Sequence, residues 1–477
     1  MIRVRFAPSP TGFLHIGGLR TCFYNWLYAK QNKGKFILRI EDTDRERMVP
    51  NAVEDLIKIL KTMGLNWDEF YTQSERLEIY QKYAQELLDK GHAYYCFCSS
   101  SELKEMREKQ IAKKMAPQYD GRCRKLSEKE IAIKIKDGQS YVIRLKIPKE
   151  DKGEFFDVIR GKIEIDLKNI DDQILLKSDK WPTYHLANVV DDHLMNITHV
   201  IRGEEWLPST IKHVLLYQFF GWKSPKFVHL PLLLNPDKSK LSKRQGDVAV
   251  EDYLSQGYLP EALLNFISLL GWNPGNDKEI FDTKGLIKDF SLKRIQKAGA
   301  IFNREKLDWL NGYYIRQMSI DDLTKECMPY LEQSGIIEKS ENLDWLKKII
   351  SLEQKRMKKL SDIINLGSYF WVDKMEYDAQ ILIWKDTPQI EIKNNLIKLE
   401  EILNKIPEAE FNSANINEKV LAWAPEEGKG SIFWPWRVAL SGLKASPPPN
   451  DIAEILGKEK TLQRIKFAIN KLKTKND

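Results

Sequence analysis

The chain has 477 residues, of which 42% are hydrophobic, and a net charge of +7. This length predicts about three domains with sizeable cores, and the mild positive charge permits nucleic-acid binding without requiring it. No apolar run approaches the roughly 18 residues of a membrane span, and the N-terminal residues lack the apolar core of a signal peptide, so no membrane association is expected. Five cysteines are too few, and odd in number, for a disulfide framework, and a cytoplasmic location is expected.

Residues 1–85 follow the order strand, glycine-containing turn, helix, strand. Residues 3–7 and 36–40 are short and apolar, and between them apolar side chains recur three and one positions apart, as on one face of a helix. This order is typical of a doubly wound α/β sheet, in which ligands bind outside the carboxyl ends of the strands. Both His15 and Glu41 follow such strand ends.

The next segment, residues 86–187, interrupts this order. Three closely placed cysteines, a basic helix at 103–114 and a hairpin-like stretch from residue 141 predict an α+β insertion. The α/β order resumes over residues 188–240, and after about residue 245 only helical periodicity is evident. The sequence therefore predicts a Rossmann-like α/β domain split by an α+β insertion and followed by an all-α C-terminal region.

Two short polar loops carry the strongest chemical signal, His15-Ile16-Gly17-Gly18 and, far downstream, Lys240-Leu241-Ser242-Lys243-Arg244. Gly17 and Gly18 at a helix N-terminus let phosphate oxygens approach backbone N–H groups. A basic loop that closes on pyrophosphate stabilises the charge that develops as a triphosphate is cleaved. If the two loops meet, they predict an ATP site with His15, Lys240 and Lys243 as catalytic groups. The alternatives are a chance turn and an exposed charged loop.

Five further residues suit a free amino acid as second substrate: Arg5, Ser9, Glu41, Tyr184 and Arg202. The carboxylate of Glu41 suits an ammonium group, and the guanidinium groups of Arg5 and Arg202 pair with carboxylates through two hydrogen bonds. Two arginines for one ligand indicate an acidic side chain in the substrate. Alternatively, each of these residues forms a structural ion pair.

Three cysteines, Cys96, Cys98 and Cys123, provide most of a zinc site. Lys125 stands where a histidine would complete the set, so the fourth ligand is Tyr119 or Asp120. The alternative is three free thiols in a small packed knuckle.

Basic residues gather in the C-terminal helical region, which favours an RNA backbone as partner over a merely solvated helix face. They are Lys347, Lys348, Lys355, Arg356, Lys358 and Lys359, followed by Lys466, Lys471, Lys473 and Lys475. The segment Trp434-Pro435-Trp436-Arg437 either stacks on unpaired bases or packs between helices.

Long motifs resemble those of bacterial glutamyl-tRNA synthetases. Residues 5–18 are similar to the HIGH signature region of that family, and residues 240–244 to its KMSKS loop. Further similarities lie at residues 38–44, 184–192, 200–206 and 438–442. The resemblance covers the whole chain and implies a class I aminoacyl-tRNA synthetase.

The resemblance implies ATP-dependent activation of L-glutamate, with Mg²⁺ accompanying ATP, and transfer to the 3′-terminal adenosine of tRNA(Glu) by a monomer. It assigns glutamate to Arg5, Ser9, Glu41, Tyr184 and Arg202, and ATP to His15, Gly17, Gly18 and Lys243. The implied domains are the two halves of the catalytic domain (1–85 and 188–240), an acceptor-stem-binding insertion (86–187), the KMSKS loop with a stem-contact region (241–320) and a helical anticodon-binding domain (321–477).

The chain departs from the family pattern at two positions. Gly18 replaces the second histidine of other class I enzymes, as is usual for the bacterial glutamyl type. Lys125 replaces the usual histidine ligand of the family's zinc site, whereas the spacing of Tyr119 and Cys123 matches that of a shortened relative that charges a queuosine base. The metal expectation is therefore one structural Zn²⁺ on Cys96, Cys98, Cys123 and Tyr119.

Several alternatives remain at this point. A glutaminyl-tRNA synthetase usually has the sequence Pro-Glu-Pro-Asn/Ser-Gly before its histidine and ends in β-barrels, whereas this chain has Pro8-Ser9-Pro10-Thr11-Gly12 and a helical end. The queuosine-charging relative lacks an anticodon domain. A catalytically silent tRNA-binding protein would not need His15, Glu41 and Lys243, and an unrelated nucleotidyltransferase would not account for the length of the similar segments. Charging of tRNA(Gln) in addition to tRNA(Glu) depends on anticodon contacts that the sequence does not locate.

Overall fold

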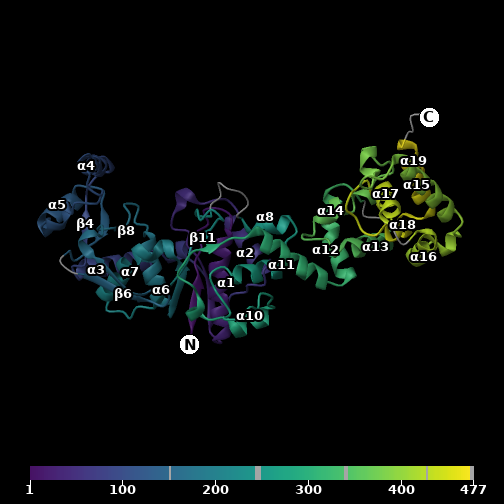
Figure 1. Cartoon of the computed structure of the whole chain (residues 1–477). Helices are drawn as coiled ribbons and strands as arrows, with labels where there is room; N and C mark the ends of the chain where they lie inside the picture. The colour runs from purple at the N-terminus through teal and green to yellow at the C-terminus, as the bar shows by residue number, and fades with distance from the viewer. Residues whose placement is uncertain (150–151, 242–248, 338–341, 426–427, 473–477) are drawn as a thin grey trace. The chain divides into compact units, whose positions relative to one another are not determined.

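The structure, a computed structural model, describes residues 1–149, 152–241, 249–337, 342–425 and 428–472 (Figure 1). The chain divides into two compact units. The first unit comprises residues 1–255 and 260–306, and the second comprises 256–259 and 307–477. No described helix has both the length and the apolar character needed to cross a membrane.

The first unit opens with a parallel sheet in the order β1-β2-β3. Its strands are β1 (Arg3–Phe6), β2 (Lys35–Ile40) and β3 (Glu69–Thr72), joined by α1 (Ile16–Gln31) and α2 (Ala52–Thr62). The apolar side chains of β2 and the apolar face of α1 are buried against each other, as the spacing predicts. Gly34 lies where a Cβ would be 2.3 Å from the backbone oxygen of Ile2, which accounts for glycine at the entry to β2.

A second sheet has the order β7-β6-β10-β9. It contains β6 (Lys152–Asp157), β7 (Gly161–Asp166), β9 (His199–Gly203) and β10 (Lys226–Leu230), and α7 (Leu207–Phe220) joins the last two. Hydrogen bonds between Arg3 and Thr198 link it to β1: the Thr198 N–H donates to the Arg3 oxygen at 2.9 Å, and the Arg3 N–H to the Thr198 hydroxyl at 3.0 Å. Strand order therefore reverses between β1 and β9, the place where doubly wound sheets bind ligands.

The hairpin predicted from residue 141 lies further along the chain in the structure. The strand expected from residue 141, β5 (Val142–Leu145), lies between β4 (Ala93–Cys96) and β8 (Ile174–Leu176) in a small antiparallel sheet. The hairpin is instead β6–β7, and β6 pairs in parallel with β10. A Cβ at Gly153 of β6 would lie 2.4 Å from the Ile211 side chain, so glycine permits β6 to pack closely on α7.

The first unit contains further helices. They are α3 (Leu77–Asp89), α4 (Ser100–Ala112), α5 (Glu128–Lys136), α6 (Tyr184–Leu194), α8 (Val250–Ser255), α9 (Pro260–Ser268) and α10 (Thr283–Asp289). The expectation of helix alone after residue 245 is wrong at one point, since β11 (Leu233–Leu234) pairs in parallel with β12 (Ala300–Ile301). Two residues are too few for strand alternation to be visible in sequence.

The described part of the second unit is helical. Its helices are α11 (Arg304–Gln317, which starts in the first unit), α12 (Ile320–Gln333), α13 (Leu343–Glu353), α14 (Asp362–Leu366), α15 (Gln389–Asn404), α16 (Ser413–Trp423), α17 (Gly430–Ser441), α18 (Pro449–Leu456) and α19 (Lys458–Lys471). The predicted fold class, a split Rossmann-like domain followed by an all-α region, is confirmed.

Candidate active site

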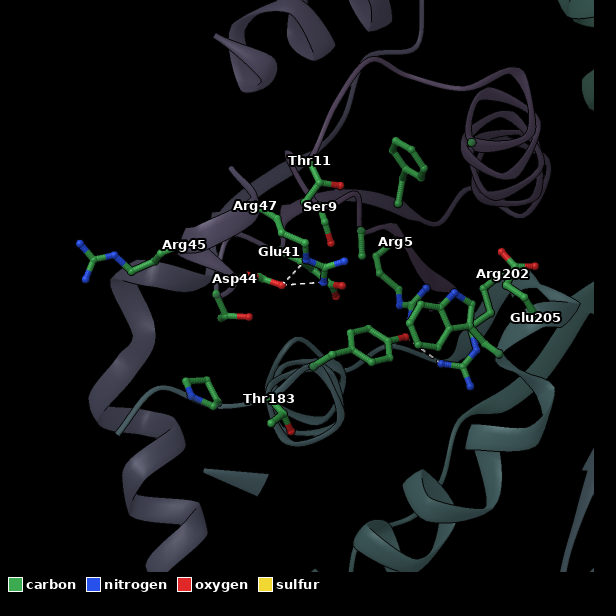
Figure 2. A pocket seen from close by; sticks show the side chains of 18 of the residues that line it. Arg5, Ser9, Thr11, Glu41, Asp44, Arg45, Arg47, Thr183, Arg202 and Glu205 are labelled. Atoms are coloured by element: carbon green, nitrogen blue, oxygen red, sulfur yellow. Dashed lines mark hydrogen bonds and ion pairs between the residues drawn. The ribbon is translucent and has the colours of Figure 1, made fainter. Parts of the chain in front are cut away.

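A pocket of about 930 Å³ lies where the strand order reverses (Figure 2). All five residues expected to bind an amino acid line it: Arg5, Ser9, Glu41, Tyr184 and Arg202. Arg5 and Arg202 project from β1 and β9, Glu41 follows β2, and Tyr184 starts α6. We call this the amino-acid pocket.

Arg5 is held in place by α6. Its Nε donates to Asp192 Oδ1 at 3.0 Å, and its Nη2 to Asn188 Oδ1 at 3.1 Å. Tyr184, Asn188 and Asp192 follow one another at intervals of four residues, so they share one face of the helix. That face turns toward the amino-acid pocket and fixes the direction of the guanidinium of Arg5.

Arg39 links Glu41 to the same helix face. Its buried guanidinium donates to Glu41 Oε1 at 3.0 Å, to Asp192 Oδ1 at 2.7 Å and to Asn188 Oδ1 at 2.9 Å. Burial raises the pKa of Glu41, although Arg39 and Arg5 favour its ionised form. For Asp192, burial also acts to raise the pKa, but Arg5 and Arg39 more than offset it, and the pKa is lowered.

Arg202 differs from Arg5 in its partners. Its Nη1 donates to the Tyr184 hydroxyl at 3.0 Å, and its Nη2 to the Thr210 hydroxyl at 2.8 Å. Among the described residues, no carboxylate forms an ion pair with Arg202. Its positive charge therefore faces the amino-acid pocket without a direct ion pair to the described carboxylates, although Glu41 and Glu205 line the same pocket.

The His15 loop lies at a second, adjoining pocket of about 410 Å³, which we call the phosphate pocket. His15 is the N-cap of α1, and its Nδ1 accepts the Gly17 N–H at 3.0 Å. In the neutral ring this places the proton on Nε2, which can then act as a hydrogen-bond donor. The two pockets share Gly17, Gly18 and Gly203 among their lining residues.

Described residues at the start of the downstream basic loop and just beyond it lie at or next to the phosphate pocket. Lys240 and Leu241 line it, and the Leu241 N–H donates to the Leu233 oxygen at 3.0 Å. At the other end, Ala249 forms a β-bridge with His15 itself. The two distant segments therefore meet, while Lys243 lies outside the described residues.

The three cysteine sulfur atoms lie within 4.8 Å of one another. The Tyr119 hydroxyl lies 3.4 Å from Cys96 Sγ and 3.6 Å from Cys98 Sγ. A hydrogen bond from Cys123 lowers the pKa of Cys96 to about 4, whereas burial raises the pKa of Tyr119. The three thiols form a donor set suited to a metal ion, and the Tyr119 hydroxyl lies beside it.

Asp120, the other ligand considered from the sequence, forms a 2.8 Å ion pair with Arg122 and is not part of the cysteine cluster. The two remaining cysteines, Cys22 and Cys327, are fully buried in α1 and α12, as predicted.

In the second unit, a groove of about 670 Å³ runs along α13 and α18. Lys347, Lys348, Lys355 and Arg356 line it. Lys347 pairs with Asp321 at 2.6 Å and Arg356 with Glu353 at 2.6 Å, whereas Lys348 and Lys355 form no ion pair with any described residue. We call it the basic groove.

Four other residues singled out in the C-terminal region make local contacts. Trp436 has no exposed surface, and Trp434 Nε1 donates to the Ile381 oxygen at 2.8 Å, so both pack between helices. Lys466 lies 3.6 Å from Glu400, and Lys471 donates to the Tyr377 oxygen. Lys473 and Lys475 lie outside the described residues.

Sequence reasoning did not single out Arg39, Asn188 and Asp192 as site residues. Asn188 and Asp192 were noted only as parts of a motif, and the four-residue spacing from Tyr184 was the signal that could have found them. Arg39 interrupts the apolar run of β2 between Leu38 and Ile40, and that position could have been recognised as a buried charge in need of partners.

Three comparisons with known proteins point to the same family. Residues 1–309 match the family model of tRNA synthetases class I (E and Q), catalytic domain, and residues 322–469 match that of an anticodon binding domain. The chain is 45% identical to the glutamate–tRNA ligase of Alkaliphilus metalliredigens (strain QYMF) over 98% of both chains. It is 43% identical to that of Prosthecochloris aestuarii (strain DSM 271 / SK 413), covering 99% of this chain and 98% of the relative.

Among solved structures, the chain is similar to a glutamate tRNA ligase from Elizabethkingia meningosepticum CCUG26117, crystallised in complex with its amino acid. The TM-score is 0.89 and the sequence identity 38%, over 99% of this chain and all of that one (100%).

The ion pairs of Asp192 lead to a stability prediction. Asp192→Asn leaves the guanidinium groups of Arg5 and Arg39 without this carboxylate, and we expect the free energy of unfolding at pH 7 to fall by about 3–5 kcal/mol. Urea denaturation measures it. Because the pKa of Asp192 is lowered in the fold, its contribution is complete above pH ~4 and lost as the pH falls through the folded-state pKa. Wild type and variant therefore converge only in acid. Asp55→Asn, at an exposed position of α2, is the matched control and changes stability by less than ~0.5 kcal/mol.

Proposed function

The chain belongs to the glutamate–tRNA ligases, which are class I aminoacyl-tRNA synthetases, and we propose that its two adjoining pockets divide the activation step between them. The amino-acid pocket binds L-glutamate, and the phosphate pocket binds the triphosphate of ATP. The observation that carries this assignment is the set of glycines, Gly17, Gly18 and Gly203, that both pockets share. A carboxylate in one pocket can reach a phosphorus atom in the other across them.

Glutamate is oriented by charge. Its reacting α-carboxylate must point toward the phosphate pocket, so its side-chain carboxylate points away from it, toward the guanidinium groups of Arg5 and Arg202. Glu41 receives the ammonium group, together with Ser9. Arg202 is the stronger attraction for the side-chain carboxylate, because Arg5 is already paired with Asp192.

Activation then requires positioning and charge stabilisation rather than a protein nucleophile. An oxygen of the α-carboxylate attacks the α-phosphorus, the bond to the bridging oxygen breaks, and pyrophosphate leaves. Class I synthetases use ATP with Mg²⁺, which neutralises part of the phosphate charge. His15 donates its Nε2 proton as a hydrogen bond to the phosphate oxygens, and Lys240 and Lys243 stabilise the departing pyrophosphate.

In the second step, a hydroxyl of the 3′-terminal adenosine of tRNA(Glu) attacks the activated carbonyl, and AMP leaves. Residues 86–187 contact the acceptor stem, residues 241–320 the stem below it, and residues 321–477 the anticodon. We propose that the chain acts as a monomer, in the cytoplasm where tRNA is charged.

The role of His15 is tested by His15→Ala. We expect glutamate-dependent pyrophosphate exchange, measured with tRNA present, to fall about 100-fold or more, because one well-placed donor to a transition state has roughly this effect. The KM for glutamate changes little, since the interaction forms mainly in the transition state. His92→Ala, a histidine outside both pockets that stacks on Phe219, serves as control. Near-normal exchange in His15→Ala would refute the assignment.

The basic groove is proposed to contact the tRNA backbone through Lys348 and Lys355, the two lysines of its lining that form no ion pair with a described residue. Replacing both by alanine is expected to weaken tRNA(Glu) binding and to flatten its log–log salt dependence by roughly 1.5 to 2, corresponding to two lost phosphate contacts. Filter binding at several salt concentrations measures both effects. Lys398→Ala, whose lysine pairs with Glu401 on α15, should leave both unchanged. An unaltered slope in the double variant would place the tRNA elsewhere.

The cysteine cluster is proposed to hold one structural Zn²⁺, with Cys96, Cys98, Cys123 and the Tyr119 hydroxyl as ligands. Elemental analysis of the purified chain is expected to give one zinc per chain. Cys98→Ser should lose most of it, and Tyr119→Phe should retain it with weaker resistance to a chelator, because three thiolates remain. Cys327→Ala, outside the cluster, keeps the metal. A wild-type chain purified without chelators that contains no zinc would exclude the site.

A further inference from the structure

The guanidinium of Arg202 is surrounded by neutral hydrogen-bond partners. Besides Tyr184 and Thr210, it contacts two buried imidazoles: its Nε donates to His229 Nε2 at 3.2 Å, and its Nη1 lies 3.3 Å from His213 Nδ1. His213 and Thr210 stand three residues apart on α7 and reach Arg202 from the same helix face. His229 is the cross-strand neighbour of Arg202 on β10.

The direction of each hydrogen bond follows from the chemistry of arginine, which only donates. His213 Nδ1 must therefore accept, so the proton of the neutral ring is on Nε2. That nitrogen lies 3.0 Å from His185 Nδ1 and donates to it. On the other side, His229 Nδ1 donates to Asp157 Oδ2 at 2.7 Å, which leaves His229 Nε2 to accept from Arg202.

Burial keeps these imidazoles uncharged. It lowers the pKa of His213 well below its usual value, with the nearby positive charge of Arg202 acting in the same direction. Burial likewise lowers the pKa of His185 to about 3 and, despite the hydrogen bond to Asp157, also lowers that of His229. At neutral pH, Arg202 is thus oriented through acceptors that do not cancel its charge.

Arg5 and Arg202 differ in the charge of the groups that orient them. Arg5 is oriented by Asp192, an ionised partner, and Asp192 is in turn shared with Arg39. A carboxylate at the position of His213 would orient Arg202 equally well. It would also form an ion pair with Arg202 and so compete with the side-chain carboxylate of the substrate. We propose that His213 is a positioning residue that orients Arg202 while leaving its charge available, and that it thereby determines the preference for glutamate over glutamine.

This inference rests on the proposed role of Arg202 in binding glutamate. It goes further in assigning specificity to a side chain that does not line the amino-acid pocket. A purely structural histidine would tolerate or reject polar replacements according to their size. A charge-preserving acceptor must instead distinguish a neutral replacement from an ionised one of the same size.

Two variants of nearly equal volume test this. His213→Asn retains a neutral acceptor close to the position of Nδ1, and we expect its KM for glutamate to stay within about threefold of wild type. His213→Asp adds a carboxylate beside Arg202, and we expect the KM for glutamate to rise on the order of 10-fold or more. The KM for ATP should not change, and the ratio of kcat/KM for glutamate to that for glutamine should fall.

Pyrophosphate exchange with tRNA present, run with each amino acid, measures these parameters, and thermal unfolding checks that each variant folds. Equal losses in the Asn and Asp variants would overturn the inference and leave His213 a packing residue. If His213→Asp does not fold, the half-buried His185 offers the same comparison: a higher KM in His185→Asp than in His185→Asn supports the inference, and equal values overturn it. A folded wild-type chain without glutamate-dependent exchange would instead refute the proposed function.

Discussion

The buried guanidinium of Arg39 forms the ion pairs on which the charged groups of the amino-acid pocket depend. It contacts Glu41 on its own strand and Asp192 on α6, and so couples β2 to the helix that also holds Arg5. A charge removed from water is tolerated only with well-placed partners. The positions of Glu41 and Asp192 are therefore set by Arg39 as much as by the substrate they serve. Without Arg39, Glu41 would lose its ion pair with that guanidinium, and Asp192, which orients Arg5, would lose one of its two arginine partners.

The two arginines of the pocket represent two electrostatic solutions to one problem. A guanidinium must be oriented before the substrate arrives, since orienting it afterwards would cost binding free energy. For Arg5 the structure uses an ionised partner, and for Arg202 it uses imidazoles and hydroxyls. The first arrangement pairs the guanidinium with a carboxylate that it shares with Arg39, whereas the second orients the guanidinium through neutral acceptors. Their combination suits a ligand with one more carboxylate than a neutral amino acid has.

The sequence predicted those parts of the fold that local patterns determine. The strands predicted on either side of the helix after His15, residues 3–7 and 36–40, lie in the structure within one residue of those bounds, and the predicted helix lies between them. The partner of β6 was not predictable, because pairing with β10 depends on tertiary packing over Gly153 rather than on the strand's own pattern. Asn188 and Asp192 were missed as site residues for a related reason: polar residues on a helix usually face solvent, and only the assembled sheet shows that this face is covered.

The glycines that line both pockets have a consequence for which ligand the proposed site binds most tightly. Gly17, Gly18 and Gly203, which both pockets share with Thr21 and Glu205, leave part of this boundary free of side chains between the proposed amino-acid and nucleotide sites. A molecule that joins both halves loses its translational freedom once rather than twice, and each half presents the other at high effective concentration. The acyl-adenylate is such a molecule. An arrangement suited to making it is therefore equally suited to retaining it until the nucleic acid arrives, which protects a labile anhydride from water.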